Sequence, residues 1–490
     1  MRDTSGPAAP AASSFTRGIA VARRAAGQRL ALDGVAPLLV LLFVAAILRF
    51  ALLGTRELFR DEAASWLLSQ ASWSEILPRA SAEPYAPVFD FALKAWTSIL
   101  GDGEAALRAL SAVAGVALVG VTWVWARASI GSHVAILAAG LVTVAPLAIS
   151  NAREARMYAL EALLATVAWW LIWRLLTDRR PMARRRIPIL LAALAVGGEL
   201  WMLPTGVGAF VMQASVVGIM LLRAPHAGSR AASAALIGGL ATFAPWIPRL
   251  MAAADAGRPF WTPTPNLGDL PETFAVAFTG QAPSPAWIAA LPLAGLAGVG
   301  LWALFRARSI RDNSDQLATA LAICGGAGLI LLWWTISQWR SAYDSRYLGA
   351  AVPPLAMAIA VGWERLAMRP KGARGASADR VLTATLVVLI GIGTFVFEAT
   401  WINGTGLAPG RAAALALSQR VRAGDFVLVA DARSYFPVAY LVGRKSDPIT
   451  LPAPVRYWRS GSEAPFSGGD LVPPDRPGAR RRSRGRRPGR

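Results

Sequence analysis

The segment 56–66 gathers charged side chains directly after a run of apolar residues. It reads Arg-Glu-Leu-Phe-Arg-Asp-Glu-Ala-Ala-Ser-Trp, and charged groups this close to hydrocarbon are costly and usually have a function. On a helix the adjacent Asp61 and Glu62 point in different directions, so one can face a cavity while the other orients the helix start. A carboxylate here, with Arg60 beside it, can take a proton from an acceptor hydroxyl. The alternative is an interfacial helix whose first-turn acids complement its dipole.

A second group of charges lies in the segment 150–158, Ser-Asn-Ala-Arg-Glu-Ala-Arg-Met-Tyr. Arg153 and Arg156 are three residues apart, so on a helix they share a face. Two guanidinium groups on one face can hold a phosphate through paired hydrogen bonds, and Glu154 adds a second carboxylate. The alternative is a pair of arginines that snorkel at the end of a membrane span. Because this segment is short and still contains two arginines, we favour phosphate binding.

Two weaker signals come from aromatic and basic residues at predicted membrane boundaries. Arg346 and Tyr347 begin a late apolar run together, where they can bind the phosphate of a lipid headgroup or form part of an aromatic belt. Lys94 belongs to an aromatic stretch that follows Pro84 and Pro87. That stretch is too short to span a membrane, and it favours an interfacial anchor over direct chemistry.

The composition places these residues in a membrane protein. Of 490 residues 55% are hydrophobic and only 16% are charged, and the mean hydropathy is +0.44. Soluble chains carry about 25% charged residues. Since a membrane-spanning helix needs about 20 apolar residues, we predict eleven spans. They lie near 35–54, 104–126, 132–149, 158–176, 187–203, 205–223, 231–250, 286–305, 317–336, 347–364 and 381–400.

The net charge of +21 is concentrated in arginine clusters between the apolar runs. Cytoplasmic loops carry such clusters, so we predict a cytoplasmic N-terminus and an outer position for 55–103, 150–157, 251–285 and 337–346. This pattern argues against a nucleic-acid partner. One cysteine and two histidines exclude an internal disulfide and argue against a Cys- or His-based metal site. There is no Gly-rich nucleotide-binding motif, which argues against direct use of ATP or a nucleotide sugar.

The predicted organisation has four parts. A cytoplasmic basic tail, 1–34, precedes a transmembrane domain, 35–400, whose first outer loop is 55–103. Segment 401–462 shows a helical and a strand-like pattern and predicts a small α/β extracytoplasmic domain. Segment 463–490, rich in Gly, Pro and Arg, predicts a disordered basic tail.

The order of these motifs resembles a known family. The chain looks like the polytopic GT-C glycosyltransferases, specifically the dolichyl-phosphate-mannose-protein mannosyltransferase-like and RgtA/B/C/D-like group. The matching segments are Asp61–Glu62, Pro84 to Phe89, Gly101–Asp102–Gly103–Glu104 through Arg108, Arg153–Glu154–Ala155–Arg156–Met157–Tyr158, and Arg346–Tyr347.

The resemblance implies an all-α GT-C membrane enzyme that transfers a sugar from a polyprenyl-phosphate carrier, with inversion, to an envelope glycan, lipid or protein on the extracytoplasmic face of the cell membrane. It implies that Asp61 is the general base or orients the acceptor hydroxyl. Glu62 and Glu154 would support it, and a divalent cation (magnesium or manganese) would be held by Asp61 and Glu154. The substrate-binding residues would be Arg60, Lys94, Arg153, Arg156, Tyr158, Arg346 and Tyr347. Alternatives are a transporter or flippase of lipid-linked sugars, which would carry acids within spans and broken helices, and a non-catalytic assembly protein.

Overall fold

The computed structural model describes most of the helical part of the chain. The described residues are 35–80, 86–178, 180–223, 225–255, 262–280, 286–305, 314–367, 409–420, 426–429, 432–443 and 456–459. The predicted tails 1–34 and 463–490 and the predicted span 381–400 lie outside them.

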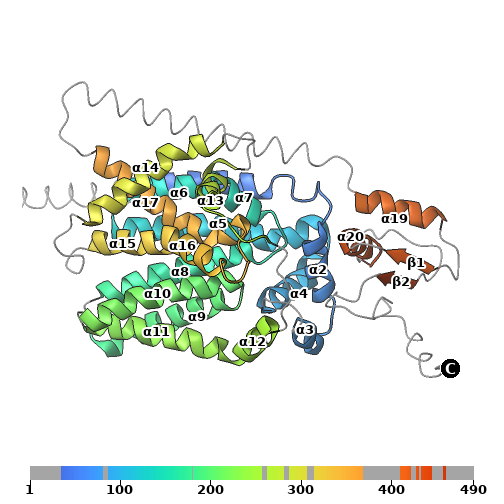
Figure 1. Ribbon diagram of the computed structural model, residues 1–490, viewed down its shortest axis with the longest axis horizontal. Helices are drawn as coiled ribbons and strands as arrows, with labels where there is room; N and C mark the ends of the chain where they lie inside the picture. Colours follow the sequence, from blue (N-terminus) through green and yellow to red (C-terminus); the bar gives the residue numbers. More distant parts are fainter. Residues whose placement is uncertain are drawn as a thin grey trace, which may run out of the picture.

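Long apolar helices run roughly alongside one another in a bundle, at the left of Figure 1. They are α5 (Glu104–Ser129), α6 (Ser132–Val144), α7 (Pro146–Ala152), α8 (Tyr158–Thr177), α9 (Arg186–Leu200), α10 (Pro204–Arg223), α11 (Ala227–Phe243), α14 (Ala286–Phe305), α15 (Ser314–Ile323), α16 (Leu329–Ile336) and α17 (Val352–Ala367). A π-helical turn, Cys324–Gly328, joins α15 to α16, and a short 3-10 helix, η4 (Ser345–Ala351), precedes α17.

The bundle has the composition of a membrane domain. Within the described residues six helices are long and apolar enough to cross a membrane, or seven if the bent pair α6–α7 is one span. They match six of the predicted positions, and a seventh if the bent pair is one span. The first described helix, Val35–Phe50, and α9, with 15 residues, are shorter than a typical span. The protein is therefore a multi-pass membrane protein, whereas the count of eleven spans stays a prediction.

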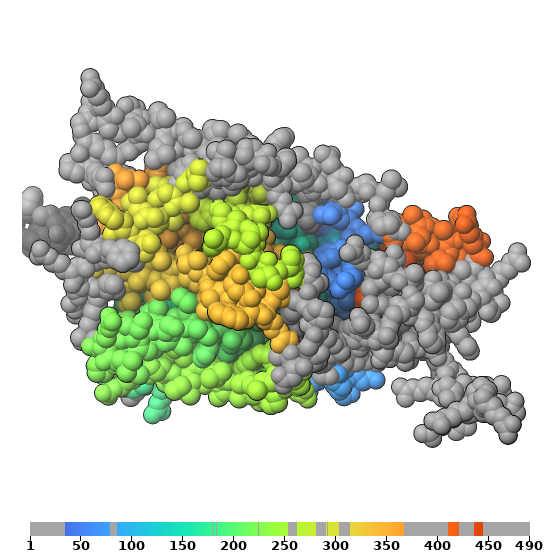
Figure 2. Space-filling view, viewed as in Figure 1, coloured from blue at the N-terminus to red at the C-terminus, as the bar shows by residue number. Residues whose placement is uncertain are grey.

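Small residues allow the bundle helices to approach closely. A Cβ on Gly239 of α11 would lie 2.5 Å from Val196 Cγ1 of α9, so only glycine fits there. Small residues at such contacts are the usual means of packing helices where lipid surrounds them. Outward-facing positions are apolar instead, such as Leu222 and Ile237, which are 85% and 69% exposed. Their helices α10 and α11 form the green lower surface in Figure 2.

The bend of 58° between α6 and α7 is stabilised by a buried arginine. Pro146 begins α7 and has no N–H, so the helical hydrogen bonding is interrupted at this point. Arg49 of the first helix is fully buried and donates to the carbonyl oxygens of Val142 at 2.9 Å and Thr143 at 3.0 Å. Arg49 thereby satisfies carbonyl groups that the bend leaves without helical partners.

Short helices lie at one end of the bundle. These are α2 (Arg60–Ser69), α3 (Trp73–Ala80) and α4 (Val88–Leu100), while α12 (Ile247–Asp255) and α13 (Asp269–Thr279) precede α14. Beyond α2 to α4, at the right of Figure 1, are α19 (Pro409–Arg420), β1 (Phe426–Val429), α20 (Ala432–Gly443) and β2 (Arg456–Arg459). The two strands pair in parallel, with Phe426 opposite Arg456. That 401–462 is a separate extracytoplasmic domain stays a prediction.

Candidate active site

Glu62 fixes the start of helix α2. Its carboxylate turns inward and is 1% exposed, and its Oε2 accepts a hydrogen bond from the backbone N–H of Phe59 at 3.2 Å. Oε1 accepts another from the backbone N–H of Ala155 at 2.8 Å. Glu62 therefore joins the first loop to the turn that carries Glu154.

Arg108 of α5 is the main partner of Glu62. Its Nε and Nη2 lie 2.7 Å from Oε1 and 2.7 Å from Oε2 of Glu62, and both side chains are buried. The guanidinium also donates to the backbone carbonyls of Leu53, Arg56 and Glu57 at 2.6, 2.8 and 2.9 Å. A single arginine thus ties the whole approach to α2 onto the bundle.

This arrangement shows how Glu62 supports the site. Both its oxygens accept hydrogen bonds from Arg108 and from backbone N–H groups. Glu62 therefore fixes the start of α2, and a direct part in the reaction stays a prediction. Arg108 was not among the expected site residues. The sequence could have indicated Arg108, because it lies one turn into an apolar span, where a charged side chain needs a partner.

Asp61 points away from Glu62, as the helical geometry predicts. Its side chain is 24% exposed, and its Oδ1 lies 3.3 Å from Nε of Arg60. Its Oδ2 lies 3.8 Å from Nη1 of Arg346, which comes from the distant helix η4. Asp61 is therefore a carboxylate accessible to solvent, with a guanidinium group facing it.

The segment 153–157 is a turn, not a helix. Helix α7 ends at Ala152 and α8 begins at Tyr158, so the prediction that Arg153 and Arg156 share a helical face is wrong. Pro146 begins α7, and the helix ends after seven residues, before either arginine. Arg153 is buried beside Arg49, at the end of α7.

Arg156 extends toward α2 instead. Its Nη1 donates to Oγ of Ser65 at 2.8 Å and to the backbone carbonyl of Asp61 at 3.3 Å. Its guanidinium also lies 5.9 Å from the centre of the Tyr158 ring. The structure thus brings Arg156 and the backbone of Asp61 together, while Arg153 lies at the end of α7.

Arg346 is oriented by its neighbours on η4. Asp344 accepts from the backbone N–H of Arg346 at 2.9 Å and lies 3.3 Å from its Nε. Nη2 of Arg346 donates to the hydroxyl of Tyr347 at 3.2 Å, and the Tyr347 ring lies 5.8 Å from that of Tyr158. These contacts direct one guanidinium nitrogen toward Asp61.

Glu154 provides a buried carboxylate in the same cluster. Its Oε2 is buried and has no hydrogen-bond partner within the described part of the chain. The pKa of Glu154 is raised to about 7. Burial is the main cause and the charge on Glu62 contributes, whereas the charges on Arg346 and Arg156 oppose the shift. Glu154 therefore changes charge near neutral pH, next to two arginines.

Lys94 does not join this cluster. Its Nζ donates to the backbone carbonyl of Ser69 at 3.1 Å and lies 5.4 Å from the centre of the Trp73 ring. Ser69 is the last residue of α2, eight positions after Asp61, which is about 12 Å along a helix. Lys94 fastens α4 to α2, so its expected place among the substrate-binding residues is not supported by its position.

A metal site is not evident in these residues. In the described part of the chain no group of three or more His, Cys, Asp and Glu side chains could hold a metal ion. Both oxygens of Asp61 face arginines, and Glu62 is occupied by Arg108. No step below depends on a metal.

Two more acids are buried inside the bundle. Thr205 of α10 donates to Oε1 of Glu161 of α8 at 2.6 Å, and Gln213 of α10 donates to Oε2 of Glu199 of α9 at 3.1 Å. Both acids and both partners are buried. These contacts link α8, α9 and α10 beneath the cluster around Asp61.

The overall fold matches that of known membrane glycosyltransferases. ArnT from Cupriavidus metallidurans, bound to undecaprenyl phosphate, aligns with a TM-score of 0.56 at 15% identity over 84% of this chain and 84% of that one. The chain therefore has a fold similar to that of this enzyme. The archaeal oligosaccharyltransferase AglB from Archaeoglobus fulgidus, in complex with an inhibitory peptide and a dolichol-phosphate, aligns with a TM-score of 0.55 at 11% identity. That alignment covers 86% of this chain and 60% of AglB.

The GT-C resemblance drawn from the motifs is thus confirmed. Residues 83–248 match the family model described as dolichyl-phosphate-mannose-protein mannosyltransferase. This segment contains Arg108, Glu154 and Arg156, while Asp61 and Arg346 lie outside it. No curated protein matches the chain.

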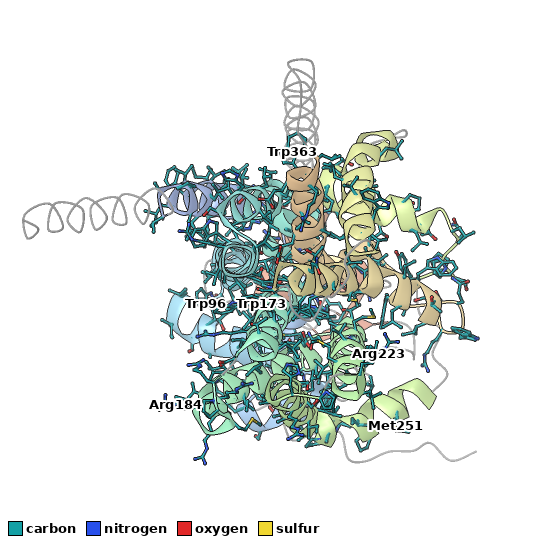
Figure 3. The ribbon with its side chains drawn as sticks, turned by 90° about the vertical axis from the view of Figure 1, so that its left-hand side faces the viewer. Trp96, Trp173, Arg184, Arg223, Met251 and Trp363 are labelled. Carbon is teal, nitrogen blue, oxygen red and sulfur yellow. The ribbon has the colours of Figure 1, made fainter. Side chains whose placement is uncertain are left out.

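The site lies at one end of the helical bundle, and a strongly basic loop lies at the other. Tyr158 begins α8 at the site, and Thr177 ends it before Arg184, which points away from the bundle in Figure 3. Twenty residues of helix separate these ends by about 30 Å. The basic loop and the site are therefore on opposite sides of a membrane around this bundle, and which side is cytoplasmic stays a prediction.

Proposed function

We propose that this protein transfers a sugar from a polyprenyl-phosphate carrier to a hydroxyl group of an envelope glycan, lipid or protein. The transfer takes place on the extracytoplasmic face of the cell membrane. The observation that carries the proposal is the convergence of Asp61, Arg156 and Arg346. These three come from segments separated by about 90 and 190 residues in the sequence, and they meet through the contacts of Asp61 with both arginines.

The groups present suit an inverting displacement. The acceptor oxygen forms a bond to the anomeric carbon while the bond from that carbon to the phosphate oxygen breaks, and the lipid phosphate leaves. Asp61 takes the proton of the acceptor as the new bond forms. Arg346 and Arg156 stabilise the negative charge that develops on the departing phosphate. Charge-assisted hydrogen bonds of this kind are strong where water is scarce.

The solved relatives support a lipid-phosphate donor. The related ArnT structure contains undecaprenyl phosphate, and the AglB structure contains a dolichol-phosphate. A lipid carrier suits a site that lies at the end of a membrane bundle and contains arginines. Tyr158 and Tyr347 pack together beside these arginines, where they can contact the sugar or the first isoprene unit. The sugar itself is not specified by these features.

The test separates donor binding from transfer. Asp61→Asn keeps the shape and removes the charge, so donor affinity should persist while the transfer rate falls by about 100- to 10,000-fold. Arg346→Ala removes charged hydrogen bonds to the phosphate, each worth about 1.5–3 kcal/mol, so the donor Kd should rise at least about tenfold. The assays are sugar transfer at saturating donor and binding of a polyprenyl-phosphate sugar.

Matched controls lie at the other end of the bundle. Asp178→Asn and Arg223→Ala remove the same chemical groups, from the residue that follows α8 and from the last residue of α10. Both variants should transfer sugar as the parent does. Near-normal transfer by Asp61→Asn, or unchanged donor binding by Arg346→Ala, would contradict the proposal.

A transporter or flippase of lipid-linked sugars is the alternative. The buried Glu161 and Glu199 and the bent pair α6–α7 are features that such a protein would also have. Each acid nevertheless binds a neutral side chain of a neighbouring helix, which is a packing contact. A transporter would move lipid-linked sugar across vesicle membranes in the Asp61→Asn variant, with no glycosylated product in the parent.

A further inference from the structure

Helix α2, which carries Asp61, cannot hold its position alone. It has 10 residues, and isolated helices shorter than about 12–15 residues are marginal in water. Its position therefore depends on the elements packed against its buried face. Arg108 and Glu62 fix its first turn, as described above. The rest of that face packs against α4 and against the C-terminal helix α20, which lies beside α2 in Figure 1.

The contact between α20 and α2 is centred on two aromatic rings. Tyr440 packs edge-on against Trp66, with ring centres 5.2 Å apart and planes at 84°, and both side chains are buried. Gly443 completes the contact, since a Cβ there would lie 3.0 Å from the Trp66 ring. An aromatic pair of this kind contributes about 0.5–1.5 kcal/mol beyond the area that it buries.

Tyr440 also reaches the loop before α5. Its hydroxyl donates to the backbone carbonyl of Asp102 at 3.0 Å. That loop leads into the helix that carries Arg108, which holds Glu62. One side chain of α20 thus contacts both α2 and the base of the helix that anchors it.

Helix α19 holds the chain on the other side of Asp61. The backbone N–H of Arg411, in the first turn of α19, donates to Oε1 of Glu57 at 2.8 Å. Gly410 allows this approach, because a Cβ there would lie 2.9 Å from Oε2 of Glu57. A carboxylate at a helix N-terminus is favoured by both the free N–H groups and the dipole.

Asp61 therefore lies between two points at which the C-terminal helices hold the chain. Glu57 is four residues before it and Trp66 is five residues after it. We propose that α19 and α20 position the Asp61 carboxylate for transfer, and that Tyr440 is the positioning residue. This inference rests on the proposed function, because it assigns these contacts a role in the reaction of Asp61. Tyr440 acts through α2 and does not touch the substrate.

The first measurement separates rate from binding. Tyr440→Ala should lower kcat about tenfold, because displacement of a reacting group by about 1 Å can cost up to 100-fold. The donor Kd should stay within about twofold, because Arg346 is positioned by η4 and not by α20. Tyr440→Phe keeps the ring and loses the hydroxyl, so its effect should be smaller, about threefold. Ser418→Ala, whose exposed hydroxyl bonds only within α19, is the control and should match the parent.

The second measurement is a double-mutant cycle with Asp61→Asn. If Tyr440 acts through Asp61, Tyr440→Ala should slow the Asp61→Asn enzyme by less than about twofold. A purely structural role would lower both backgrounds equally. The inference is overturned by a full additional loss in the Asp61→Asn background, by a parallel loss of donor binding, or by parent-like transfer in both Tyr440 variants.

A third measurement does not require activity. Amide hydrogen exchange over 60–69 should be faster in Tyr440→Ala, or in Tyr440→Phe if the alanine variant does not fold, and unchanged in Ser418→Ala. Unchanged exchange overturns the inference even if the parent transfers sugar. If the parent does not transfer sugar but the Tyr440 variant exchanges faster over 60–69, the proposed function is overturned. The contact by which α20 positions α2 would then still be established.

Discussion

Replacing Arg108 by Met should loosen the first loop and abolish transfer. The guanidinium makes five hydrogen bonds, two to Glu62 and three to loop carbonyls. Without it the Glu62 carboxylate stays buried and unpaired, and breaking a buried ion pair in this way costs about 3–5 kcal/mol. The carbonyls of Arg56 and Glu57 are partly exposed, so water replaces much of what they lose, whereas the carbonyl of Leu53 is buried.

The double variant Arg108→Met with Glu62→Gln should be more stable than the sum of the single changes predicts. It removes the unpaired charge and leaves only the loop carbonyls, each worth about 1 kcal/mol. The coupling energy is the amount by which the two single losses together exceed the loss in the double variant. We expect a coupling of about 2 kcal/mol between the two positions. The free energy of unfolding, from titration with a denaturing detergent in mixed micelles, gives this value.

An exposed pair of the same chemistry provides the control. Arg365 lies 3.7 Å from Asp315, and 50% and 37% of their side chains are exposed. Replacing these two residues in the same way should give no measurable coupling, because solvent screens exposed ion pairs. If the pair of Arg108 with Glu62 behaves like this control, the buried pair does not hold the loop and the reasoning is refuted.

Three further predictions follow from the structure. Because the pKa of Glu154 is raised to about 7, its carboxylate becomes charged as the pH rises through 7 and should then weaken binding of the phosphodiester donor. Glu154→Gln should remove this pH dependence of the donor Kd. An unchanged pH profile in this variant would argue against a role of Glu154. Thr205→Val leaves Oε1 of Glu161 without its donor and should cost about 1–3 kcal/mol of unfolding free energy, whereas Glu161→Gln, whose amide oxygen can still accept, should cost less. In a chain without its native cysteine, a cysteine at Ser72 should react with an impermeant thiol reagent in intact cells and one at Ala183 should not; the reverse pattern would invert the predicted orientation.

The sequence by itself determined the class of the protein and the residue types of its site. The length of an apolar run sets whether a helix can cross a membrane, and this is a local property of the chain. The sequence also determined that the side chains of Asp61 and Glu62 point in different directions, because adjacent side chains on a helix diverge wherever the helix lies. The different surroundings of the two carboxylates follow from this divergence.

Only the tertiary structure decided which of these residues meet. Arg346 faces Asp61 because η4 packs onto α8, and nothing in the local pattern of either segment specifies that contact. Glu62 is held by Arg108, 46 residues away along the chain. The helical spacing of Arg153 and Arg156 predicted a shared face, but α7 ends at Ala152 and both arginines lie in the turn before α8. Spacing predicts neighbours within one element, whereas a site made of several elements depends on how the helices pack against each other.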